Sequence, residues 1–201
     1  MKRLVLPLLL ISFFPLQVNA LQLKSGDIIL ESLYCSLCSL IEAEEKTPFS
    51  HMGVLVFSQG NWNVLESWEK VRITPLTTFL SRRKKDSLAL VLRPHSNQIK
   101  VKLDANSLLN RFDNGFNGLS YDSEFLWNNS DTRGEKLYCS EFVTKFLAPF
   151  LVNSVPTKPM HYEMNRDEWL QYFHGNPPDG APGNSPGDFE RSPLFNHVGT
   201  L

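Results

Sequence analysis

Residues 51–67, HMGVLVFSQGNWNVLES, decide the expected fold because they have the pattern of a β-hairpin. Two largely apolar runs, residues 51–57 and 63–67, flank the turn-forming segment Ser58-Gln59-Gly60. His51 opens the first run, and Glu66 lies near the end of the second. The hairpin therefore brings an imidazole and a carboxyl group into one small unit of structure.

The register of this hairpin decides whether the two groups can interact. A turn at residues 57–60 would place His51 directly opposite Glu66 and Gly53 opposite Val64. Directly opposed residues share a face, with Cβ atoms roughly 5 Å apart. A slip of one residue would put them on opposite faces. Gly53 would leave open space for a substrate beside His51, although a glycine in a strand can equally mark a bulge.

Cys139 is the candidate nucleophile. It lies in the stretch LYCSEFV, residues 137–143, which opens a predicted helix over residues 138–150. The free amides and dipole of a helix start favour negative charge, so we expect a lowered thiol pKa and a possible oxyanion site. A buried structural thiol is the alternative. Cysteine, histidine and carboxylate are the parts of a nucleophile, its base and the group that orients the base.

The rest of the chain alternates between short strands and helices. Further strands are expected at residues 28–30, 71–73 and 88–92, and helices at residues 36–45, 75–83, 97–111 and 167–173. Residues 114–129 read as a loop, and residues 174–193, rich in Pro and Gly, as irregular or mobile. Central strands flanked by helices predict the α+β class, with a catalytic domain over residues 21–173 and a tail over residues 174–201.

Residues 1–20 have the pattern of a signal peptide. Lys2 and Arg3 precede an apolar stretch, residues 4–16, and Val18-Asn19-Ala20 fits a small-x-small cleavage site. A membrane anchor is the alternative, but the stretch is short for a span, which needs roughly 20 apolar residues. We therefore expect cleavage near Ala20, a mature chain in the periplasm or outside the cell, and no stable membrane span.

Composition excludes several classes of partner. Apolar residues make up 42% of the 201 residues, as in ordinary globular proteins. Without Lys2 and Arg3 the chain has 18 basic and 21 acidic residues, a net charge of about −3. This balance offers no basic surface for nucleic acid, so the expected partner is a small peptide, acyl-amide or lipid substrate. The oligomeric state stays open.

The cysteine count bears on the redox state. Three cysteines in an oxidising compartment leave at least one free thiol, and Cys35 and Cys38 could pair or stay reduced on a buried helical face. Their two-residue spacing also suits thiol–disulfide exchange, although no thioredoxin-like βαβ pattern surrounds them. Four ligands with zinc-like spacing cannot be assembled from the motifs, so we expect neither a metal nor a cofactor.

Four motifs in order carry a resemblance to a known family. They are KSGDII (residues 24–29), TPFSHMG (residues 47–53), VLES (residues 64–67) and YCSEFV (residues 138–143). Together with GLSYD (residues 118–122), they resemble the YiiX-like permuted papain-fold amidases, a branch of the NlpC-type peptidases. In this chain the histidine precedes the cysteine, the reverse of the papain order, as a circular permutation requires.

The resemblance implies a small antiparallel sheet or barrel packed against the cysteine helix. It also implies Cys139 as nucleophile, His51 as base and Glu66 as orienter, and Tyr121 is a candidate for substrate or oxyanion binding. The expected activity is hydrolysis of a peptide or acyl-amide bond through a thioester, with a cell-wall peptide as one example of a substrate. The alternatives are an acyl hydrolase or acyltransferase acting on lipid, a redox protein using Cys35 and Cys38, and a non-catalytic binding module.

Overall fold

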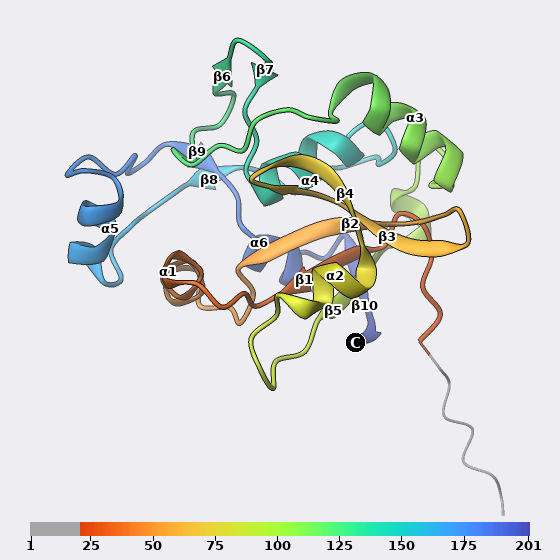
Figure 1. Ribbon diagram of the computed structural model, residues 1–201, viewed down its shortest axis with the longest axis horizontal. Coiled ribbons are helices and arrows are strands. Elements are labelled where there is room, and N and C mark those ends of the chain that lie inside the picture. Colours follow the sequence, from red (N-terminus) through yellow and green to blue (C-terminus); the bar gives the residue numbers. More distant parts are fainter. Residues whose placement is uncertain (1–20) are drawn as a thin grey trace, which may run out of the picture.

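An open antiparallel sheet forms the centre of the computed structural model, which describes residues 21–201 (Figure 1). Its strand order is β10-β5-β1-β2-β3-β4. The strands are β1 (Ile28–Glu31), β2 (His51–Ser58), β3 (Asn61–Trp68), β4 (Lys70–Pro75), β5 (Leu90–Pro94) and β10 (Phe195–Thr200). Because β10 and β4 are separate edges, the structure has the sheet form of the expected α+β fold. The predicted signal peptide lies outside the described residues.

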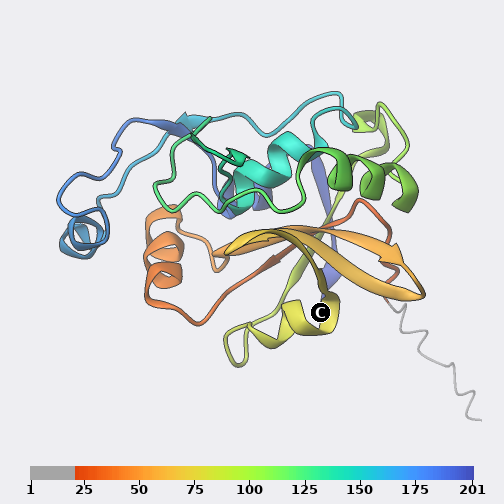
Figure 2. The same cartoon turned by 45° about the horizontal axis from the view of Figure 1, so that its top comes forward.

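Helices cover both faces of this sheet. Figure 2 shows α3 (Ala105–Gly115) and α4 (Cys139–Leu147) on one side and α2 (Leu76–Ser81) on the other. The remaining elements are α1 (Ser36–Glu45), η1 (Ser96–Gln98), α5 (Arg166–Tyr172), α6 (Pro186–Glu190) and the two-residue strands β6 (Ser130–Asp131), β7 (Gly134–Glu135), β8 (Lys158–Pro159) and β9 (Pro182–Gly183). No helix within residues 21–201 is both long and apolar enough to cross a bilayer.

The unbroken apolar run of β2 follows from this cover on both faces. Met52 and Val54 pack in the core beneath α4, whereas Leu55 packs with Val64 and Phe79 on the α2 side. A strand that is buried on both faces reads as continuously hydrophobic rather than alternating. The hairpin is therefore the centre of the domain, with a helix layer above and below it.

The β2–β3 register differs from the predicted one by two residues. Gly53 pairs with Glu66, and the strands extend to Ser58 and Asn61. The turn residues Gln59 and Gly60 have φ angles of 51° and 77°, the left-handed pair that a tight two-residue hairpin turn needs. Because side-chain direction has a period of two, a shift of two residues keeps His51 on the same face as Glu66.

Two of the predicted helix starts are wrong. The helix expected over residues 97–111 begins only at Ala105, because the Asp104 side chain accepts a hydrogen bond from the Ser107 backbone N–H and caps it. Pro75, expected as the first helical residue, ends β4 with an extended ψ of 137°. The helix predicted over residues 36–45 is confirmed as α1.

The segment expected to be irregular is partly ordered by its own sequence. Ser185 and Asp188 form a capping box that starts α6. Phe189 on this helix is 2% exposed and stacks on Phe195, with ring centroids 5.7 Å apart. The chain then adds β10 to the central sheet beside β5. The last residues of the chain thus belong to the same sheet as the hairpin.

Gly53 leaves no open space for a substrate, contrary to the expectation. A Cβ at this position would lie 2.4 Å from Val64 Cγ1 and 2.7 Å from the Leu65 carbonyl oxygen. The glycine instead allows β3 to lie close to β2, where Glu66 approaches His51.

Gly53→Ala is therefore expected to lower the free energy of unfolding by about 1–3 kcal/mol, since it overpacks the hairpin. Urea unfolding measures this loss. Gly115→Ala is the matched control, because nothing lies within 4 Å of a Cβ placed there. Equal unfolding midpoints for the two variants would contradict the packing role of Gly53.

Candidate active site

The Glu66 carboxylate is fully buried and receives four hydrogen bonds. His51 Nε2 lies 2.7 Å from Oε2, and Arg82 Nη2 lies 2.6 Å from the same oxygen. Thr74 Oγ1 donates to Oε1 at 2.5 Å, and Arg72 Nε does so at 3.5 Å. Burial alone would raise the pKa of Glu66, but the hydrogen bonds from His51, Arg82 and Thr74 lower it to about 2. Glu66 is therefore a carboxylate at neutral pH.

The Glu66 charge fixes the tautomer of His51. An ionised carboxylate can only accept hydrogen bonds, so Nε2 carries the proton and Nδ1 of the neutral ring is the basic nitrogen. The ring lies between Phe79 and Trp68, with centroid distances of 5.5 and 5.4 Å. Burial lowers the pKa of His51 and outweighs the opposite effect of Glu66. His51 is therefore a neutral base that is held in place on three sides.

Cys139 begins α4, as the sequence predicts, but its thiol pKa moves in the unexpected direction. Burial raises the pKa of Cys139 to about 12, although the backbone N–H groups of Ser140, Met52 and Cys139 itself lower it. The effect of the helix start is thus present but smaller than the loss of water. The thiol and the imidazole are both uncharged in this state.

Cys139 and His51 belong to opposite faces of the sheet. Cys139 packs in the core beneath α4 together with Met52. The His51 ring stacks instead on Phe79 of α2. The hydrogen bonds of residues 21–201 include none between the thiol and the imidazole. A proton can therefore pass between the thiol and the imidazole only where the sheet is open between its two faces.

Such an opening lies where the pairing of β2 with β3 ends. The two strands pair only from Gly53 onward, so Met52 lies beyond the ladder. Its backbone N–H acts on the Cys139 thiol, and Ser67 Oγ on β3 donates to the Leu137 carbonyl oxygen at 2.6 Å. Residues 137–139 therefore lie over this opening. Their contact on β2 is Met52, the residue that follows His51 in the chain.

Cys139 also lines a cavity that encloses about 520 Å³, counting its open mouth. Its wall is largely apolar and aromatic, with contributions from Ile41, Phe125, Tyr138, Met160, Tyr162 and Trp169. Tyr121 lies in this wall as well, and burial together with the nearby Cys139 raises its phenol pKa well above the ordinary value. Its hydroxyl therefore stays a hydrogen-bond donor beside the sulfur.

Three of the side chains that bind Glu66 were not predicted from the sequence: Arg72, Thr74 and Arg82. Arg72 and Thr74 alternate along β4, and Arg72 pairs directly with Glu66, so strand alternation could have placed both on its face. Arg82 is the residue that follows α2, and no local sequence pattern predicts that it binds Glu66. Its position depends on how α2 packs on the sheet.

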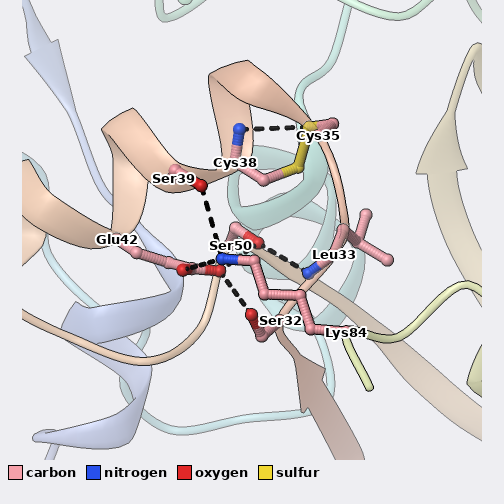
Figure 3. The surroundings of a disulfide bond; sticks show 8 residues. All are labelled: Ser32, Leu33, Cys35, Cys38, Ser39, Glu42, Ser50 and Lys84. Atoms are coloured by element: carbon pink, nitrogen blue, oxygen red, sulfur yellow. Dashed lines mark hydrogen bonds and ion pairs between the residues drawn. A yellow bond between two sulfur atoms is a disulfide. The ribbon is translucent and has the colours of Figure 1, made fainter. Parts of the chain in front are cut away.

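Cys35 and Cys38 form a disulfide, which leaves Cys139 as the free cysteine of the described residues (Figure 3). Cys35 caps α1, and its sulfur accepts a hydrogen bond from the Cys38 backbone N–H. One turn further, Glu42 accepts hydrogen bonds from Ser32 and Ser50 at 2.6 and 2.9 Å. The helix is thereby tied to the residue before His51.

Comparison with known proteins shows the family and the fold of this chain. Residues 22–198 match a family described as permuted papain-like amidase enzymes, YaeF/YiiX, C92. YiiX of Escherichia coli (strain K12), an uncharacterized protein, is 29% identical over 126 residues, which cover 63% of this chain but only 58% of that protein. The crystal structure of YiiX from Escherichia coli O157:H7, described as a metalloprotein, is 22% identical with a TM-score of 0.73 over 89% of this chain and 96% of that one. At that identity the second likeness concerns the fold.

The raised thiol pKa predicts how the alkylation rate of Cys139 depends on pH in the substrate-free protein. The rate of Cys139 alkylation by iodoacetamide should keep rising with pH toward about 12. In the urea-unfolded chain it should level off near the ordinary thiol pKa of about 8.5. Mass spectrometry measures both rates. The Cys35→Ser/Cys38→Ser variant should give the same folded profile, and a folded midpoint at or below the unfolded one would refute the burial effect.

Proposed function

The chain belongs to the permuted papain-like amidase family, and from this membership we propose that it hydrolyses amide bonds with Cys139 as nucleophile, His51 as base and Glu66 as orienter. One observation carries the proposal. The buried Glu66 holds His51 in the tautomer whose Nδ1 is free to accept a proton. That nitrogen belongs to the residue next to Met52, whose N–H acts on the thiol.

In the first half of the proposed reaction, the thiol attacks the substrate carbonyl. Because the Cys139 thiol is neutral at rest, His51 Nδ1 takes its proton as the sulfur–carbon bond forms. The imidazolium is stabilised by the Glu66 carboxylate at Nε2. The oxyanion is bound by backbone N–H groups at the start of α4, with the Tyr121 hydroxyl as a further donor.

The second half releases the two products. His51 gives its proton to the leaving amine, the carbon–nitrogen bond breaks, and a thioester to Cys139 remains. Water then attacks the thioester while His51 again accepts a proton, which frees the carboxylic acid and restores the thiol. No cofactor takes part in these steps.

The cavity supports a substrate with an apolar or aromatic group beside the scissile amide. Its wall is largely apolar, the character of protein sites that hold small organic ligands. We propose a cell-wall peptide or an acyl-amino acid. Hydrolysis or transfer of a lipid acyl group is the second candidate, because the same wall would accommodate a hydrocarbon chain.

The proposed location is the periplasm or the outside of the cell. The Cys35–Cys38 disulfide supports it, since such bonds persist mainly in oxidising compartments. The metal implied by the description of the YiiX crystal structure does not fit here. No three His, Cys, Asp or Glu side chains of residues 21–201 are grouped to hold a metal ion, so no step is assigned to one.

Hydrolysis of a panel of acyl-amino-acid and peptide p-nitroanilides tests the function. Cys139→Ala should abolish turnover, and His51→Ala should lower kcat/KM by about 10²–10⁴-fold, the usual contribution of a general base. Acid quenching of the wild type should trap the acyl group on Cys139, as seen by mass spectrometry. Cys35→Ser/Cys38→Ser is the control and should stay active. Activity that survives Cys139→Ala, or that disappears with the control pair, would refute the assignment and favour another site.

A further inference from the structure

A second buried carboxyl group, Glu31, lies beside the His51–Glu66 pair and has no role in the proposed reaction. Glu31 ends β1 and pairs across the strands with His51. Its side chain is 0% exposed, and neither carboxyl oxygen has a hydrogen-bond partner. A buried carboxyl group without partners is costly, and proteins rarely keep one without a use for it. Burial raises the pKa of Glu31 to about 8.

Arg82 lies between the two carboxyl groups and is only half used. Its Nη2 is 2.6 Å from Glu66 Oε2 but 3.9 Å from Glu31 Oε1. Its Nε and Nη1 are buried and have no partner. The guanidinium lies over Trp68 and Phe79, at 5.1 and 5.2 Å from their ring centroids. The nitrogen of Arg82 that binds Glu66 is thus also within ion-pair distance of Glu31, whose two oxygens have no hydrogen-bond partner.

The titratable and charged groups that face Glu31 come from the end of α2, from β3 and from β2. Arg82 and Arg83 follow α2 and favour its ionisation, whereas Glu66 on β3 opposes it. His51 on β2 faces it across the strand pair and is neutral. One arginine in direct reach therefore serves two carboxyl groups, and only Glu66 is ionised when Arg82 is bound as observed.

We propose that Glu31 and Arg82 are positioning residues of this site: the proton on Glu31 decides which carboxyl group Arg82 binds, and through Glu66 it tunes His51 as a base. The inference rests on the proposed function. While Glu31 is protonated, Arg82 stays on Glu66 and takes part of the negative charge that faces His51. When Glu31 releases its proton to solvent, its carboxylate attracts Arg82. Glu66 then keeps less positive charge around it, and the imidazolium is better stabilised.

The proton on Glu31 also makes the stability of the folded protein depend on pH. The folded protein holds the Glu31 proton up to about pH 8, whereas the unfolded chain loses it near pH 4.5. Stability therefore falls as pH rises through this window, because the unfolded state releases a proton that the folded state retains. Glu31→Gln mimics the protonated form, so it should melt higher than the wild type at pH 8, with a smaller difference below pH 4.5.

The direct test is the ¹⁵N spectrum of the His51 ring during a pH titration of the full mature chain. In the wild type the Nε2 signal should shift with a midpoint close to that of Glu31, about pH 8, and Glu31→Gln should abolish this shift. Glu69→Gln is the matched control, since Glu69 is an exposed carboxylate that binds Arg72 at 3.0 Å and should leave the titration unchanged. A wild-type Nε2 signal with no such shift, or a shift that persists in Glu31→Gln, would overturn the proposal.

Enzyme kinetics separate this inference from the proposed function. The kcat/KM of the wild type should rise several-fold across the Glu31 titration. The control Glu69→Gln should keep that rise, whereas Glu31→Gln and Arg82→Lys should both flatten it. If no amide is hydrolysed although the Nε2 shift depends on Glu31, the proposed function fails and the coupling stands. If hydrolysis is normal but its pH profile is the same in Glu31→Gln, the coupling fails and the function stands.

Discussion

The buried carboxylate of Glu66 is the interaction on which the site depends. An ionised group with no exposed surface is tolerated only when hydrogen bonds replace its water. Here the donors come from β2, β4 and the end of α2, so satisfying one charge fixes three elements relative to β3. The same requirement orients His51, because the carboxylate accepts a hydrogen bond from Nε2–H and leaves Nδ1 without a proton.

The proposed site would join two faces of one sheet, and this arrangement sets its electrostatics. α4 carries Cys139 on one face, while α2 covers the His51–Glu66 pair on the other (Figure 2). Both reactive groups are therefore deeply buried, and burial favours the neutral form of each. In the proposed reaction the charged pair arises only as the sulfur attacks, when the fixed Glu66 charge can stabilise the imidazolium.

Local pattern was enough to predict part of this structure. The alternation of side chains placed His51 and Glu66 on one face even though the register was wrong by two residues, since only an odd shift separates them. The start of the cysteine helix followed from its apolar run. The direction of the thiol pKa did not follow, because burial depends on how α4 packs on the sheet. Arg82 and the cavity wall from residues 160–186 were equally hidden, since they meet the site only through contacts between distant segments.

A crystal structure with a substrate-like aldehyde bound to Cys139 as a hemithioacetal tests the central claim most directly. The account predicts that Nδ1 of His51 makes a hydrogen-bonding contact at the sulfur or its adduct while Nε2 stays on Glu66. It also predicts that the adduct oxygen faces the backbone N–H groups at the start of α4. The claim that these two faces form one site would be contradicted if Nδ1 pointed away from the adduct and the ring stayed on the α2 face of the sheet.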